Sequence, residues 1–123
     1  MKIGYARVSK DEQDLAPQLH ALDAAGCGEV FQDQGWSGAS AARPGLLAAL
    51  EAAKGGDTLT VWRIDRLGRS TLHLLQILED LHRRTIAFQS IMDGIDTNTA
   101  AGRMVFSMVS AMAEFERSVI SEA

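Results

Sequence analysis

Short apolar runs alternate with segments of helical periodicity along most of this 123-residue chain. The apolar runs cover residues 2–8, 29–32, 58–63 and 86–91. The segments between them cover residues 15–25, 44–54 and 70–84, each with leucines at helical spacing. Parallel neighbouring strands need crossover connections, which helices usually provide. The alternation therefore predicts an α/β fold in which a mainly parallel sheet of four to five strands is flanked by helices.

The final segment, residues 99–123, has a helix-forming composition and would be on the order of 30 Å long. Apolar residues cover more than one of its sides, which is too much for a helix packed on a single sheet face. We expect this helix to pack on its own sheet and on a partner chain, so that the chain divides into an α/β domain, residues 1–98, and the start of a long dimerisation helix. The residues expected at the dimer interface are Met104, Met108, Met112, Phe115 and Val119.

The composition is that of an ordinary globular protein, with 46% hydrophobic and 23% charged residues. No apolar run approaches the roughly 18 residues of a membrane span, and the start of the chain lacks the layout of a signal peptide. Cys27 is the only cysteine, which excludes an internal disulfide, and we expect it to be a small buried hydrophobe. These features favour a cytoplasmic protein without membrane contact.

Two of the apolar runs end in hydroxyl and guanidinium groups. Arg7 and Ser9 end the first run, and the sequence Arg-Ile-Asp-Arg-Leu-Gly-Arg-Ser, residues 63–70, follows the third. If these strands are parallel neighbours, the Ser9 hydroxyl faces an arginine cluster at the carboxyl edge of the sheet, where open α/β sheets bind their ligands. Guanidinium groups match phosphate oxygens and stabilise the charge of a phosphoryl transition state. The expected cluster consists of Arg7, Arg66 and Arg69, with Arg43 within reach and the carboxylate of Asp65 among them.

The net charge of −4 does not exclude nucleic acid as a partner, because clustered arginines can form a positive pocket on an acidic protein. Other phosphate and hydrolytic motifs are absent from the sequence: it contains no GxxxxGK[ST], no GxGxxG and no GxSxG. The histidines, His20, His73 and His82, fall on helical segments without partners at metal-ligand spacing. We therefore expect neither a metal nor a cofactor.

Together, these motifs resemble those of the serine site-specific recombinases of resolvase and DNA invertase type, over essentially the whole chain. The stretches that carry the resemblance are residues 5–9 (YARVS), 11–13 (DEQ), 37–38 (SG), 43–46 (RPGL), 56–59 (GDTL), 62–70 (WRIDRLGRS), 94–97 (GIDT), 102–103 (GR) and 113–117 (AEFER). The strand-end pair followed by Asp-Arg-Leu-Gly-Arg-Ser is the most specific part of this pattern.

The resemblance implies that Ser9 is a nucleophile that attacks a DNA phosphodiester, forming a covalent 5′-phosphoserine link and freeing a 3′-hydroxyl. Because the link conserves the energy of the broken bond, rejoining would need neither ATP nor a metal ion. Asp65 would either orient an arginine or help to protonate the leaving oxygen. The residues implied to bind the scissile phosphate are Arg7, Arg66 and Arg69, assisted by Arg43 and Gln13.

The same resemblance implies that residues 1–98 are the catalytic domain of such an enzyme. Its partners would be a double-stranded DNA recombination site in the nucleoid and further copies of the chain, as a homodimer and as a tetramer in the synaptic complex. The helix-turn-helix domain of this family has no counterpart among these 123 residues.

Two alternatives belong to other functional classes. The chain could be a non-catalytic dimerisation module that assembles on DNA, or a small flavodoxin-like domain that binds a phosphate or a nucleotide. The intact set of Ser9 and arginines argues against the first alternative, and the lack of a glycine-rich phosphate loop argues against the second.

Overall fold

The computed structural model describes residues 1–8, 15–34, 44–63 and 71–122. Within these ranges the strands are β1 (Lys2–Val8), β2 (Cys27–Gln34), β3 (Thr58–Val61), β4 (Ala87–Ser90) and β5 (Ile95–Asp96). The helices are α1 (Ala16–Ala24), α2 (Pro44–Ala52), α3 (Thr71–Arg83) and α4 (Ala100–Glu122). Their order along the chain confirms the predicted alternation of strands and helices.

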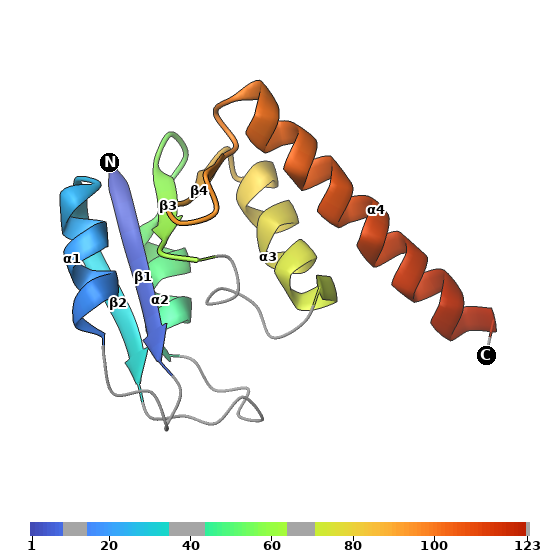
Figure 1. The fold of residues 1–123 in the computed structure, drawn as a ribbon, viewed down its shortest axis with the longest axis horizontal. Coiled ribbons are helices and arrows are strands. Elements are labelled where there is room, and N and C mark those ends of the chain that lie inside the picture. The colour runs from blue at the N-terminus through green and yellow to red at the C-terminus, as the bar shows by residue number, and fades with distance from the viewer. Residues whose placement is uncertain (9–14, 35–43, 64–70, 123) are drawn as a thin grey trace.

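The strands form one sheet in the order β2-β1-β3-β4-β5 (Figure 1). β1 lies between β2 and β3 and pairs with both in parallel, and β3 pairs with β4 in parallel. Only β5 runs antiparallel to its neighbour, β4, among these described strands. The predicted mainly parallel sheet is therefore confirmed.

Helices cover both faces of this sheet (Figure 1). On one face α2 and α3 enclose a core that includes Ile3 and Tyr5 of β1. On the other face α1 packs Leu15 and Leu22 against Ala6. Because successive side chains of a strand point to opposite faces, Tyr5 and Ala6 belong to different cores. The domain thus has three layers, with the sheet in the middle.

Two details differ from the expectations. β2 extends beyond the predicted residues 29–32 at both ends, because its pairing with β1 runs from Cys27 opposite Lys2 to Gln34 opposite Val8. Leu47, one of the leucines of the predicted helical segment 44–54, is 61% exposed, whereas Leu46 is buried, since only one side of α2 faces the sheet.

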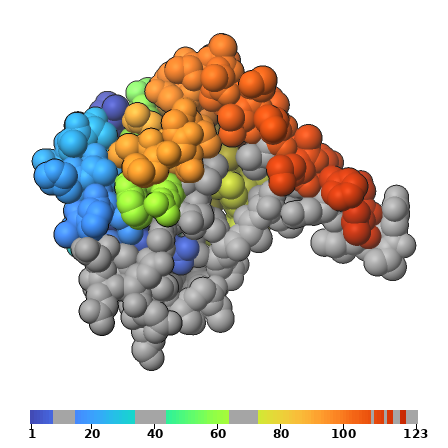
Figure 2. Space-filling model, viewed as in Figure 1, coloured from blue at the N-terminus to red at the C-terminus, as the bar shows by residue number. Residues whose placement is uncertain are grey.

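The long helix α4 begins on the domain and then leaves it. The Thr99 hydroxyl accepts a hydrogen bond from the Gly102 amide at 3.0 Å, which caps the first turn. Phe106 packs against the core, with its ring 5.8 Å from that of His82 on α3. Farther along, α4 extends away from the sheet (Figures 1 and 2). Among the described residues, no helix is long and apolar enough to cross a membrane.

Candidate active site

The carboxyl ends of β1 and β3 lie side by side at one edge of the sheet. Their parallel pairing runs from Lys2 opposite Thr58 to Tyr5 opposite Val61. The condition set in the sequence analysis, that these two strands are parallel neighbours, is therefore met. β2 ends at the same edge, with Gln34 opposite Val8. The carboxyl ends of β1, β2 and β3 therefore lie next to one another, and the motifs identified in the sequence follow these strand ends along the chain.

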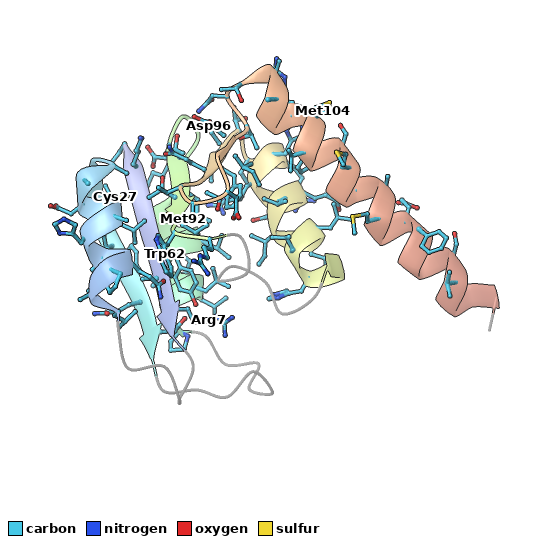
Figure 3. All side chains as sticks on the ribbon, in the orientation of Figure 1. Arg7, Cys27, Trp62, Met92, Asp96 and Met104 are labelled. Carbon is cyan, nitrogen blue, oxygen red and sulfur yellow. The ribbon has the colours of Figure 1, made fainter. Side chains whose placement is uncertain are left out.

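Most of the expected catalytic groups lie outside the described residues. Arg7 is the exception, and it lies half-buried near the end of β1 (Figure 3). The distances between these groups therefore stay predictions. The residues outside the described ranges are Ser9, Gln13, Arg43, Asp65, Arg66 and Arg69.

The backbone of Arg7 is held by a side chain from α1. The Gln18 side chain donates a hydrogen bond from Nε2 to the Arg7 carbonyl oxygen at 2.9 Å, and its Oε1 accepts one from the Arg7 amide at 3.2 Å. Gln18 is only 1% exposed. This pair fixes the main chain two residues before Ser9.

A second buried group, the carboxylate of Asp33, joins three elements near the same edge. Asp33 is 4% exposed and lies near the end of β2. Its Oδ2 accepts hydrogen bonds from the Tyr5 hydroxyl at 2.7 Å and from the Leu46 amide at 3.0 Å, and its Oδ1 accepts one from the Gly45 amide at 2.8 Å. A carboxylate at a helix N-terminus satisfies amides that have no partner inside the helix. Asp33 thereby fixes the start of α2, just after the position of Arg43.

An arginine and an aromatic ring lie at the end of β3. The guanidinium carbon of Arg63 is 4.5 Å from the centre of the Trp62 ring, at cation–π distance. The Met92 amide donates to the Trp62 carbonyl at 2.8 Å, so the segment after β4 lies beside this pair (Figure 3). Arg63 is exposed. Among the described residues, it adds a second positive charge to that of Arg7 near the carboxyl ends of β1 and β3.

Gln18 and Asp33 were not singled out from the sequence, although a signal exists for each. Gln18 lies three residues after Leu15 and four before Leu22, so it falls on the same side of the helix as these two leucines. Asp33 lies two residues after Phe31 and therefore faces the same side of its strand. A polar residue on a buried face needs a hydrogen-bond partner, and that requirement identifies both positions.

Two other kinds of reactive group can be assessed in the described part of the chain: the thiol of Cys27 and clusters of possible metal ligands. Cys27 is half-buried, and this burial raises the pKa of its thiol above the usual 9.0, which disfavours the nucleophilic thiolate. No group of three or more His, Cys, Asp or Glu residues suited to a metal ion occurs within the described ranges.

The residues expected at a dimer interface form an exposed apolar row on α4. Their exposed fractions run from 49% at Val119 to 69% at Phe115. Met104, labelled in Figure 3, begins the row near the start of the helix. Exposed apolar surface of this extent on one helix is typical of an interaction site. The members of the row are Met104, Met108, Met112, Phe115 and Val119.

Comparison with known proteins identifies relatives of the whole chain. The family described as "Resolvase, N terminal domain" matches residues 2–123. The DNA-invertase of Escherichia phage P1 is 50% identical over 122 residues, which cover 99% of this chain and 65% of that protein. The serine recombinase gin of Escherichia phage Mu is 47% identical over 122 residues, covering 99% of this chain and 63% of that protein. The chain thus spans just under two thirds of the length of these curated relatives.

Solved structures agree with the fold. The N-terminal catalytic domain of TP901-1 integrase superposes with a TM-score of 0.78 at 32% identity, covering 97% of this chain and 98% of that one. A resolvase family site-specific recombinase from Streptococcus pneumoniae gives a TM-score of 0.74 at 22% identity, covering 98% of this chain and 89% of that one. The second likeness concerns the fold alone.

Proposed function

Because this chain belongs to the resolvase N-terminal domain family, we propose that it is the catalytic domain of a site-specific DNA recombinase. The observation that carries the proposal is the parallel pairing of β1 with β3. This pairing brings the end of the strand that precedes Ser9 next to the end of the strand that precedes Asp65, Arg66 and Arg69. The proposed substrate is double-stranded DNA at a recombination site, which would place the protein at the nucleoid.

In the proposed reaction the Ser9 oxygen attacks a DNA phosphorus atom. The Ser9 hydroxyl loses its proton as a new Ser9–phosphate bond forms, the bond from phosphorus to the 3′ oxygen breaks, and that oxygen leaves as a 3′-hydroxyl by gaining a proton, so that no net proton is consumed. Rejoining is the reverse attack by a 3′-hydroxyl on the phosphoserine, so the bond energy is kept and no nucleotide is consumed. Asp65 supplies the leaving-group proton or orients an arginine.

Fixed positive charges provide the phosphate binding and the transition-state stabilisation in the proposed reaction. Guanidinium groups cannot act as ordinary bases because they stay protonated, but they can hold the phosphate and offset the charge that develops on its oxygens. Arg7 is well suited to this role, since its backbone is anchored on both polar groups by Gln18. The other residues assigned to the phosphate are Arg66 and Arg69, with Arg43 and Gln13 assisting.

The exposed row on α4 supports assembly of the protein into dimers, and of two dimers into a tetramer that holds two DNA sites. Recombination exchanges strands between two duplexes, so four active serines must meet in one complex. The adaptable side chains of three methionines suit an interface that packs in more than one way.

The test is covalent capture on DNA. The protein containing this chain is incubated with a duplex that carries its recombination site and a nick beside the cleavage point, so that the freed fragment diffuses away. We expect a protein–DNA adduct that resists denaturation and is lost in Ser9→Ala. Ser118→Ala, at an exposed serine of α4, is the matched control and should retain the adduct.

An adduct that persists in Ser9→Ala contradicts the proposed nucleophile. Binding to the site without any adduct favours the alternative, a non-catalytic dimerisation module that assembles on DNA.

A further inference from the structure

Gln18 holds both polar groups of the Arg7 backbone, and we propose that it is a positioning residue for the Ser9 nucleophile. The inference rests on the proposed function above, and concerns how the reactive segment is held rather than what it does. Ser9 follows Arg7 by two residues, so the placement of the Arg7 main chain sets the start of the segment that carries the hydroxyl.

The strand pairing explains why a side chain is needed here. β3 pairs with β1 only as far as Tyr5, which lies opposite Val61. β1 continues for three more residues, and there β3 no longer offers it a backbone partner. The Gln18 carboxamide presents one donor and one acceptor, at 2.9 and 3.2 Å, to the carbonyl and the amide of Arg7. At Arg7 it therefore provides the kind of backbone pairing that β3 provides as far as Tyr5.

The two hydrogen bonds between Gln18 and Arg7 also join the two ends of the connection between β1 and α1. Residues 8–17 separate Arg7 from Gln18, and this interval contains both Ser9 and Gln13. A buried amide that bonds to the backbone at both of its polar atoms has little freedom to move, and leaving either atom unpaired would be costly. The connection is thus tied to the sheet at Arg7 and to the α1 face that bears Leu15 and Leu22.

The carboxamide has no chemistry to offer a phosphate from this position, because both of its polar atoms are engaged and the residue is 1% exposed. Its effect on the reaction is therefore geometric. A displacement of about 1 Å at a reacting atom can slow a reaction by about 100-fold. Loss of the anchor should slow cleavage while leaving DNA affinity nearly unchanged.

The test uses two variants of similar size. Gln18→Met removes both hydrogen bonds and keeps the length of the side chain. In Gln18→Glu the ionised carboxylate accepts from the Arg7 amide but repels the Arg7 carbonyl, whereas the protonated form again offers one donor and one acceptor. The matched control is Gln89→Met on β4, because the buried Gln89 oxygen accepts no hydrogen bond within the described residues.

Two readouts separate positioning from overall stability. Amide hydrogen exchange, measured by NMR on the folded protein, should accelerate at Arg7 in Gln18→Met and stay unchanged at Ile3 and Tyr5. The rate of serine–DNA adduct formation at saturating DNA should fall by about 10- to 100-fold. In Gln18→Glu the rate relative to wild type should recover as the pH is lowered from about 8 to about 5.5, since burial favours the protonated acid.

Unchanged exchange at Arg7, or an unchanged adduct rate, in folded Gln18→Met would overturn the inference. If Gln18→Met does not fold, Gln18→Glu decides: recovery on acidification supports the inference, and a rate ratio independent of pH overturns it. A wild-type protein that forms no adduct refutes the proposed function instead, and the exchange at Arg7 still reports whether Gln18 anchors the strand.

Discussion

At the scale of single residues, the close approach of α2 to β2 at Gly45 determines how these two elements pack. Gly45 lies where a Cβ atom would come within 2.3 Å of the Gln32 carbonyl oxygen and 2.9 Å of the Asp33 Oδ1 atom. Only glycine lets α2 start close enough for its amides to reach the Asp33 carboxylate. The Arg-Pro-Gly-Leu motif therefore has a structural reason at its third position, beside the chemical one proposed for Arg43.

Gly45→Ala should destabilise the fold by about 1–3 kcal/mol, because the backbone of β2 or α2 must shift to admit the methyl group. Urea unfolding followed by circular dichroism measures the change. Gly55→Ala is the control, since its Cβ would meet nothing nearer than the Arg84 carbonyl oxygen at 3.4 Å. Equal stability of the two variants would contradict the role given to Gly45.

Some of the functional residues can be recognised from the sequence alone. Ser9 and the arginines stand out because hydroxyl and guanidinium groups at strand ends are an unusual combination. Gln18 and Asp33 do not stand out, because each acts through bonds to the backbone of another element. Periodicity can indicate that these two polar side chains are buried, but it does not say which backbone groups they bond to, and those partners are identified only once β1, α1 and α2 are placed together.

At the scale of elements, Arg84 connects the ends of two helices on the same face of the sheet. Its Nη2 donates to the carbonyl oxygens of Leu50 and Ala53, both at 2.8 Å, at the end of α2. Its Nη1 donates to Asp80 Oδ2 at 3.3 Å, and Arg83 donates to Asp80 Oδ1 at 2.8 Å. Asp80 thus orients the side chain that fixes α2 against α3.

Hydrogen bonds from Arg83 and then from Arg84 lower the pKa of Asp80 below its usual 3.8. A carboxylate with a lowered pKa in the folded state stabilises the protein above the unfolded pKa, and this stabilisation is lost as the pH falls through the folded value. We expect wild type to exceed Asp80→Asn in stability at neutral pH and to lose that advantage below about pH 3.8. Urea unfolding of both proteins at neutral and acid pH measures the difference. An advantage that is the same at both pH values would contradict this role of Asp80.

The strands and helices themselves could mostly be predicted. The leucine pattern of α3 is a reliable signal because Leu75, Leu78 and Leu81 are all buried. β5 has only the two residues Ile95 and Asp96, which is too short for any periodicity. It forms because Phe88 and Thr97 bond to each other across the turn, with the Phe88 amide donating to the Thr97 hydroxyl at 2.8 Å.

At the scale of the whole molecule, α4 is the element that the domain does not bury. Its first turns are tied down by Thr99 and by Gly102, where a Cβ would overlap the Asp96 carbonyl, so the direction of the helix is set by the domain. Its apolar row, which runs from Met104 to Val119, faces solvent. A second copy of the chain that covers this row would explain why these positions of α4 are apolar, because the single chain leaves them exposed.

Met108→Lys should therefore weaken self-association, because burying an unpaired ammonium group in an apolar interface is costly. Sedimentation of wild type should show a dimer, and the variant should shift toward monomer at the same concentration. Met92→Lys places the same charge at an exposed methionine outside α4 and serves as the control. A wild-type protein that stays monomeric at high concentration would contradict the proposed interface.

The central claim is that Ser9 becomes covalently attached to a 5′ phosphate of DNA. The most direct test is mass spectrometry of the captured protein–DNA adduct after protease and nuclease digestion. We predict that the nucleotide remnant maps to the peptide containing Arg7 and Ser9, on the serine oxygen, with a free 3′-hydroxyl on the released strand. A remnant attached to any other residue, or a 3′ phosphate on the released strand, would contradict the account.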